Sequence, residues 1–94
     1  MTPKRDIKQW STIYRGLGNP NRLRILRILT AVEKMSVSDL ADELEITIKN
    51  TSRNLGILLN LDLLEFRGRH DRVYYSLNPK MAEEIKTILR ITFK

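Results

Sequence analysis

Apolar residues recur at every second position over residues 63–77, whereas before and after this segment they recur at helical spacing. This change of period restricts the fold more than any other feature, because an alternation of two is typical of half-buried strands. The tetrapeptide Gly-Arg-His-Asp at 68–71 interrupts the alternation as a turn. The segment therefore predicts a two-stranded hairpin within an otherwise helical chain of 94 residues.

Capping residues set the limits of the predicted helices. Asn19 followed by Pro20 is a typical start, because the Asn side chain can cap the helix and Pro needs no N–H partner at its first position. Asn78 and Pro79 repeat this pattern. The expected helices cover about 4–17, 20–33, a short segment capped by Ser36 or Ser38, 47–60 capped by Thr47, and 79–91.

Only Glu45 and Ile46 separate the third predicted helix from Thr47, and helix, tight turn, helix is the helix-turn-helix layout. With the hairpin behind it, the predicted fold is a winged helix-turn-helix. It is mainly α with a small β-hairpin, in the order four helices, two strands, one helix. A chain this short predicts a single domain over 1–94, with its terminal helices available for dimerisation.

Four segments in this order resemble successive blocks of the ArsR-type winged-helix transcriptional repressors. They are "LGNPNRLRILRIL", "SVSDLADEL", "TSRNLGILLNLDLLEFRGR" and "RVYYSL", and together they span nearly the whole chain. The resemblance implies a regulator that binds double-stranded DNA, reads it with residues near the start of the fourth helix, and forms a homodimer through its terminal helices.

One side of the fourth predicted helix is polar and has no evident role in folding; it carries Lys49, Asn50, Ser52 and Arg53. The DNA major groove admits a helix, and there Arg can pair with guanine and Asn with adenine. The resemblance adds Ile48, which either contacts a thymine methyl group or packs in the core. Asn54, where the family often has His, and Gly56 depart from the family pattern.

The hairpin is expected to act as the wing. Arg67, Arg69 and Arg72 can neutralise phosphates, and Arg69 or His70 at the tip can enter a narrow minor groove. The alternative is a solvated turn in which Asp71 partly cancels the positive charge.

Asn21 and Arg22 are further candidates for phosphate contact. They lie in the first turn of the second predicted helix, where free N–H groups attract anions. The alternative for these two residues is simple capping and a structural ion pair.

Apolar residues on the two terminal helices exceed what a small winged helix needs to close its core. The predicted dimer interface comprises Ile7, Trp10, Ile13, Tyr14, Ile85, Ile88 and Leu89. A twofold dimer would set its two recognition helices about one DNA turn, roughly 34–36 Å, apart, so the expected operator is palindromic. The alternative is that this stripe belongs to the core of a single chain.

The formal net charge of +6 favours a polyanionic partner. The absence of cysteine excludes disulfides, thiolate metal sites and cysteine nucleophiles. No apolar run approaches the roughly 20 residues of a membrane span, and the first ten residues lack the apolar stretch of a signal peptide. We therefore expect a cytoplasmic protein that is not associated with membranes.

The metal sites of the resembled family are not reproduced. Ser36 and Ser38 stand where one site has two cysteines, and neutral hydroxyls bind soft metals poorly. The last predicted helix carries Glu83 and Glu84 but no histidine, which another family site requires. We expect no metal at these sites, no other cofactor and no enzymatic activity, because His70 is the sole histidine and no catalytic triad or phosphate loop occurs.

The leading hypothesis is a sequence-specific, homodimeric repressor, with the helix at 47–60 in the major groove and the wing at 66–74 on the backbone or minor groove. Two alternatives belong to other classes. One is a winged-helix module that binds proteins, and the other is an architectural or RNA-binding protein that uses charge alone.

Overall fold

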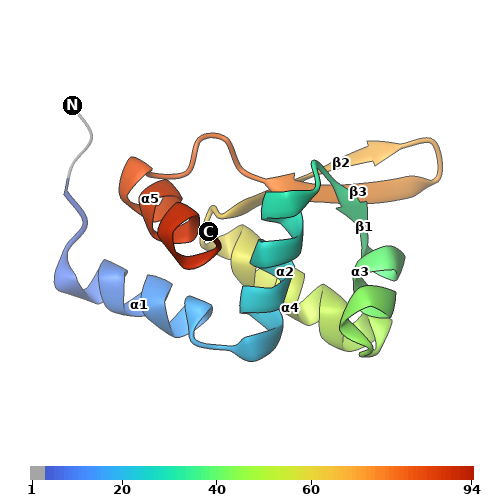
Figure 1. The fold of residues 1–94 in the computed structure, drawn as a ribbon, viewed down its shortest axis with the longest axis horizontal. Helices are drawn as coiled ribbons and strands as arrows, with labels where there is room; N and C mark the ends of the chain where they lie inside the picture. Colours follow the sequence, from blue (N-terminus) through green and yellow to red (C-terminus); the bar gives the residue numbers. More distant parts are fainter. Residues whose placement is uncertain (1–3) are drawn as a thin grey trace.

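The computed structural model describes residues 4–94 and contains five helices and three strands within them. In chain order these are α1 (Ile7–Leu17), α2 (Pro20–Ala31), β1 (Met35–Ser36), α3 (Val37–Leu44), α4 (Ile48–Asn60), β2 (Leu64–Arg69), β3 (Arg72–Leu77) and α5 (Glu83–Thr92). In Figure 1 the helices gather around α2, and the β2–β3 hairpin extends past α3. This order confirms the predicted winged helix-turn-helix, mainly helical with a small sheet. Residues 1–3, which the single-domain prediction includes, lie outside the described residues.

Helix α1 begins later than predicted, at Ile7 instead of Lys4, because Asp6 caps it. The N–H of Gln9 donates to Asp6 Oδ1 over 2.8 Å, and the N–H of Asp6 donates to Gln9 Oε1 over 2.8 Å. This reciprocal capping box satisfies free N–H groups at the helix start and fixes the first turn at this point.

The predicted starts of α2 and α4 are confirmed. Asn19 caps α2 with Pro20 at the first helical position, and Thr47 caps α4 by accepting the N–H of Asn50 over 3.0 Å. Helix α2 ends at Ala31, slightly earlier than predicted, because Val32 is already extended.

The turn between α3 and α4 is short because its backbone hydrogen bonds fold it back onto α3. Ser36, one of the two predicted caps, accepts the N–H of Asp39 over 3.2 Å and so begins α3. At the other end, Glu45 adopts a left-handed conformation with φ 57°, and the N–H of Ile46 donates to the carbonyl of Ala41 over 3.2 Å. This closing pattern turns the chain sharply enough for α4 to start two residues later.

The sheet has three antiparallel strands in the order β1-β3-β2, one more than predicted. Strand β1 contains only Met35 and Ser36, which pair with Tyr75 and Tyr74 of β3. Two residues carry no detectable period, so the sequence alone does not indicate this strand. The hairpin is also tighter than predicted: the strands pair as far as Arg69 and Arg72, leaving a two-residue turn.

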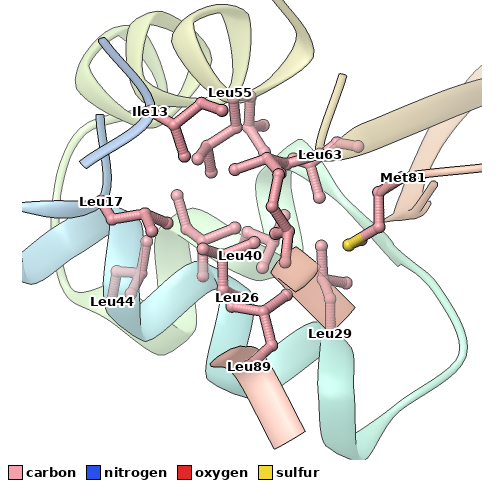
Figure 2. Packing of buried hydrophobic residues seen from close by; sticks show 14 residues of the cluster. Ile13, Leu17, Leu26, Leu29, Leu40, Leu44, Leu55, Leu63, Met81 and Leu89 are labelled. Atoms are coloured by element: carbon pink, nitrogen blue, oxygen red, sulfur yellow. The ribbon is translucent and has the colours of Figure 1, made fainter. Parts of the chain in front are cut away.

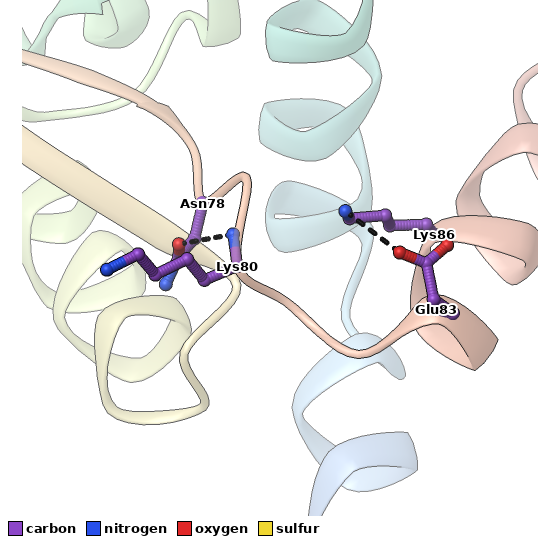
Figure 3. A network of polar contacts seen from close by, with 4 residues as sticks. All are labelled: Asn78, Lys80, Glu83 and Lys86. Carbon is purple, nitrogen blue, oxygen red and sulfur yellow. Dashed lines mark hydrogen bonds and ion pairs between the residues drawn. The ribbon is translucent and has the colours of Figure 1, made fainter. Parts of the chain in front are cut away.

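The predicted start of the last helix at Asn78 and Pro79 is wrong by several residues. Asn78 instead accepts the N–H of Lys80 over 2.9 Å and closes a separate turn (Figure 3). Helix α5 then starts at Glu83 without a side-chain cap, and Lys86 pairs with Glu83 over 3.2 Å in its first turn. A cap followed by proline marks a turn as readily as a helix start, which explains the error.

One hydrophobic cluster draws on all five helices and on β2 (Figure 2). Its fully buried members at the centre include Ile25, Leu26, Leu40, Leu55, Leu58 and Leu63. The cluster holds α4 against α2 and α3, so the first turn of α4 projects from a rigid body.

Gly56→Ala is expected to stabilise the fold. Gly56 lies mid-helix in α4, and an added Cβ would meet no atom within 4 Å. Because glycine weakens a helix by roughly 1 kcal/mol relative to alanine, we expect the free energy of unfolding to rise by about 0.5–1 kcal/mol. Urea denaturation followed by circular dichroism would measure the change, and a decrease would contradict the open environment of this position.

Candidate nucleic-acid interface

The inner side of α4 anchors the helix in the protein. Thr51, Asn54, Leu55 and Leu58 are buried there. Thr51 is fully buried, and its hydroxyl donates to the carbonyl of Thr47 over 2.9 Å. The opposite side of the first two turns is thereby fixed toward solvent.

The structure places the predicted reading residues together on that outer side. Lys49, Ser52 and Arg53 are exposed, and Asn50 is half-buried at the edge of the face. Ile48 is 54% exposed, so the alternative that it packs in the core is excluded. These five residues form what we call the α4 outer face.

The strand pairing gathers the predicted wing arginines on one face of the hairpin. Arg67 is opposite Tyr74 and Arg69 is opposite Arg72. Directly paired residues of antiparallel strands point to the same side, as do residues two apart on one strand. Arg67, Arg69 and Arg72 therefore share one face, and all three are exposed. His70 lies in the turn with φ 60°, so the predicted tip residue is at the tip.

Lys34 adds a cation to this face, and sequence reasoning missed it. Its Nζ lies 5.2 Å from the centre of the Tyr74 ring, which β3 presents on the arginine face. Glu33 and Glu65 line the same groove together with Arg67. The positive charge is consequently concentrated toward the tip of the hairpin. Only the pairing of β1 with β3 brings Lys34 close to Tyr74, so no local pattern indicates it.

Asn21 and Arg22 stand at the start of α2 as predicted, but their hydrogen bonds are made within the protein. Asn19 Oδ1 accepts both backbone N–H groups, over 2.9 Å from Asn21 and 3.1 Å from Arg22. The Arg22 side chain donates to the carbonyl of Gly16 and, through Nη1, to Asn54 Oδ1 over 3.0 Å. These contacts favour the structural alternative, with a neutral amide in place of the expected ion pair. Phosphate contact by Asn21 and Arg22 stays a prediction.

Asn54 connects this arginine to the α4 outer face. Its Nδ2 donates to the carbonyl of Asn50 over 3.0 Å and to Asn50 Oδ1 over 2.9 Å. Asn54 is only 3% exposed and has no free polar atom. Sequence reasoning noted it only as a departure from the family. A polar residue on the buried side of α4, four positions after Asn50, was the available signal.

The predicted dimer residues fall into two groups. Three of them belong to the core of the chain itself: Ile13, Ile85 and Leu89. Ile7 is 85% and Tyr14 55% exposed, while Trp10 and Ile88 are half-buried. Ile91, which is not among the predicted interface residues, is 61% exposed on α5. Exposed apolar side chains on both terminal helices therefore carry the dimer prediction.

No three histidine or acidic side chains within residues 4–94 come together as a possible metal site. None of the helices in this part of the chain has the length and apolar character needed to cross a bilayer.

Comparison with known proteins agrees with this geometry. A family described as "Helix-turn-helix domain" matches residues 17–66, which run from the end of α1 into β2. Over 82 residues the chain is 26% identical to the cadmium resistance transcriptional regulatory protein CadC homolog of Staphylococcus aureus, covering 87% of this chain and 68% of that protein.

Solved structures show the same arrangement. Reduced HlyU from Vibrio cholerae superimposes with a TM-score of 0.77 at 25% identity, covering 89% of this chain and 84% of that one. Mb0332 from Mycobacterium bovis, a homodimeric winged helix-turn-helix DNA-binding domain described as a possible ArsR-family transcriptional regulator, gives a TM-score of 0.76 at 25% identity. Its alignment covers 98% of this chain and 86% of the Mb0332 fragment. These relatives agree with the predicted resemblance to ArsR-type regulators.

Proposed function

The chain belongs to the helix-turn-helix domain family and is a winged-helix DNA-binding transcriptional regulator, and from this we propose that it acts as a homodimeric, sequence-specific repressor. The observation that carries the proposal is the α4 outer face, an exposed set of hydrogen-bonding side chains on a helix whose other side is locked into the core. In this proposal α4 enters the major groove of double-stranded DNA.

The wing supplies the second contact. Arg67, Arg69 and Arg72 face one way and are free to meet phosphates, and Arg69 or His70 at the tip enters the minor groove. Phosphate contacts position a protein on the duplex but carry no sequence information. Base selection therefore falls to the α4 outer face, including a thymine methyl contact by Ile48.

The dimer forms through the exposed apolar residues of α1 and α5. Ile7, Tyr14 and Ile91 would each leave water on association, with Trp10 and Ile88 beside them. A twofold axis through this interface presents two α4 helices about one DNA turn apart, so the operator is palindromic. A dimer bound over a promoter would exclude RNA polymerase and so repress transcription. A regulator of this kind works in the cytoplasm.

We infer that neither of the family's familiar metal sites operates here. The hydroxyl of Ser36 is buried and engaged as the cap of α3, while Ser38 is exposed. Glu83 pairs with Lys86, and no histidine accompanies it on α5. If a signal regulates this protein, we infer that it acts at a place other than these two sites.

Selection of binding sites from a random duplex pool, followed by gel shifts at several salt concentrations, tests the function. We expect a palindromic site bound far more tightly than random duplex, and protection of the same site in the protein's own promoter region. Equal affinity for all duplexes, with a steep salt dependence, would instead support the architectural alternative that relies on charge alone.

Arg53→Ala is expected to weaken binding to the selected site by about 1–3 kcal/mol, since a guanidinium on the α4 outer face can pair with guanine. Arg53 is exposed, so the fold should keep its stability. Arg27→Ala removes the same charge from an exposed position of α2 and serves as the matched control. Titration against the site and its single-base variants measures both effects, and equal losses in the two variants would argue against a base contact by Arg53.

A further inference from the structure

The hydrogen bonds that connect α2 to the α4 outer face all donate the same way, from Arg22 toward Asn50. Arg22 donates to Asn54 Oδ1, and Asn54 donates in turn to Asn50 Oδ1. We call these three residues the amide relay. Asn54 is buried within it, Arg22 and Asn50 are half-buried, and only Asn50 reaches the surface that would meet DNA.

The cation at one end determines how both amides are oriented. A guanidinium has only donors and stays protonated, so the Asn54 atom that faces Arg22 has to be the oxygen. The Nδ2 group of Asn54 then faces Asn50, and Asn50 meets it with Oδ1. Reversing the Asn54 amide would set donor against donor and leave buried polar groups unpaired, which is strongly unfavourable.

This orientation decides what Asn50 offers to a ligand. Because Oδ1 of Asn50 is turned toward Asn54, the Nδ2 group at the other end of the same amide is the free end. The paired contact with adenine, which the residue type of Asn50 allows, needs both atoms of the amide to face the base. A single outward donor fits the relay better.

We propose that the Arg22–Asn54 pair holds Asn50 as a hydrogen-bond donor toward the DNA, so that Asn54 sets a base preference without touching the base. The proposal rests on the function proposed above. In the major groove a donor is matched by guanine O6 and N7, adenine N7 or thymine O4, whereas cytosine presents its N4 donor. Asn54 is thus a positioning residue for the readout by Asn50.

Asn54→Asp reverses the relay while keeping its link to Arg22. The carboxylate still accepts from Arg22, but it cannot donate to Asn50, whose backbone carbonyl and Oδ1 both accept from Asn54 Nδ2 in the wild-type protein. It accepts from Asn50 Nδ2 instead, which turns Asn50 Oδ1 outward as an acceptor. At one base pair in each half-site we expect the preference to move from acceptor edges toward cytosine N4 or adenine N6 by about threefold to tenfold. The remaining positions of the site keep their preferences.

Two controls separate positioning from charge and from stability. Asn60→Asp makes the same charge change at an exposed position on the same helix, and it should select the wild-type site. Asn50→Ala removes the readout, so adding Asn54→Asp to it should change nothing further at that base pair. If Asn54 had a purely structural role, Asn54→Asp would weaken binding equally at every base pair of the site, both in the wild-type protein and in Asn50→Ala.

The outcomes separate a failure of the amide-relay proposal from a failure of the proposed sequence-specific DNA binding. If wild-type protein selects no sequence, the proposed function fails and the relay has no role in readout. If wild type and Asn60→Asp select one site and Asn54→Asp selects it with unchanged relative affinities, the relay proposal fails alone.

A measurement on the wild-type protein covers the case in which Asn54→Asp does not fold. Nuclear magnetic resonance of the side-chain amides should show slow solvent exchange for Asn54 and fast exchange for Asn50. Protected Asn50 amide protons would place its Nδ2 inward and overturn the proposal.

Discussion

Tyr14→Glu is expected to dissociate the proposed dimer and to lower affinity for the proposed palindromic site by roughly 100- to 10,000-fold, because binding of two linked half-sites is lost. Tyr14 is 55% exposed on α1, with its ring centre 6.1 Å from that of Trp10. Burying a carboxylate in an apolar interface is far more unfavourable than leaving it in water. Because Tyr14 lies outside the monomer core, the isolated chain should still fold.

Thr12→Glu is the matched control for this prediction. Thr12 is exposed on the same helix, two residues and so roughly 200° around from Tyr14, away from the apolar side. Analytical ultracentrifugation would give the oligomeric state of both variants, and gel shifts would give their affinities. A Tyr14→Glu protein that stays dimeric and binds normally would remove α1 from the interface.

Leu26→Ala is expected to lower the free energy of unfolding by about 2–5 kcal/mol, a large part of the roughly 5–15 kcal/mol that folded domains have. Leu26 is fully buried at the centre of the hydrophobic cluster, in contact with the helices that hold α4 (Figure 2). Its loss would leave a cavity that a small, closely packed core can fill only in part.

Val32→Ala provides the comparison for Leu26→Ala. Val32 is 39% exposed at the end of α2, so its truncation should change stability by less than about 1 kcal/mol. Urea denaturation of both proteins at one concentration would measure the difference, which must be read at fixed protein concentration if the dimer contributes. Similar losses in the two variants would contradict the central position of Leu26 in the core.

Much of the fold could be predicted because residues close in the sequence determine where most of its helices begin. Asn19, Ser36 and Thr47 are side-chain caps, and each begins a helix where the sequence predicted one. The start of α5 could not be predicted in this way, since Ala82 offers no cap. Strand β1 was missed because it exists only through pairing with β3, far along the chain.

The candidate nucleic-acid interface also combines features that local sequence indicates with features that depend on contacts between distant elements. Four members of the α4 outer face could be predicted from helical spacing and residue type, and Ile48 only from the resemblance to ArsR-type repressors. The structure places all five side by side. For Asn54 the only signal in the sequence was its spacing from Asn50, and for Lys34 there was none, because the contact of each is made with a partner in another element: Asn54 with Arg22 and Lys34 with Tyr74. For the terminal helices the pattern showed which residues are apolar. Only the packing of the monomer separates Ile13, used internally, from Tyr14, left outside.

The two-residue strand β1 joins the wing and the helix-turn-helix into a single mechanical unit. Ser36 both pairs with Tyr74 at the base of the wing and begins α3, so the hairpin cannot tilt without pulling on the first turn of that helix. The pairing of β1 with β3 thereby restrains movement of the hairpin relative to α3 within one subunit. In the proposed dimer, any adjustment to the spacing of an operator therefore occurs between the two subunits, at α1 and α5, which leave apolar side chains exposed.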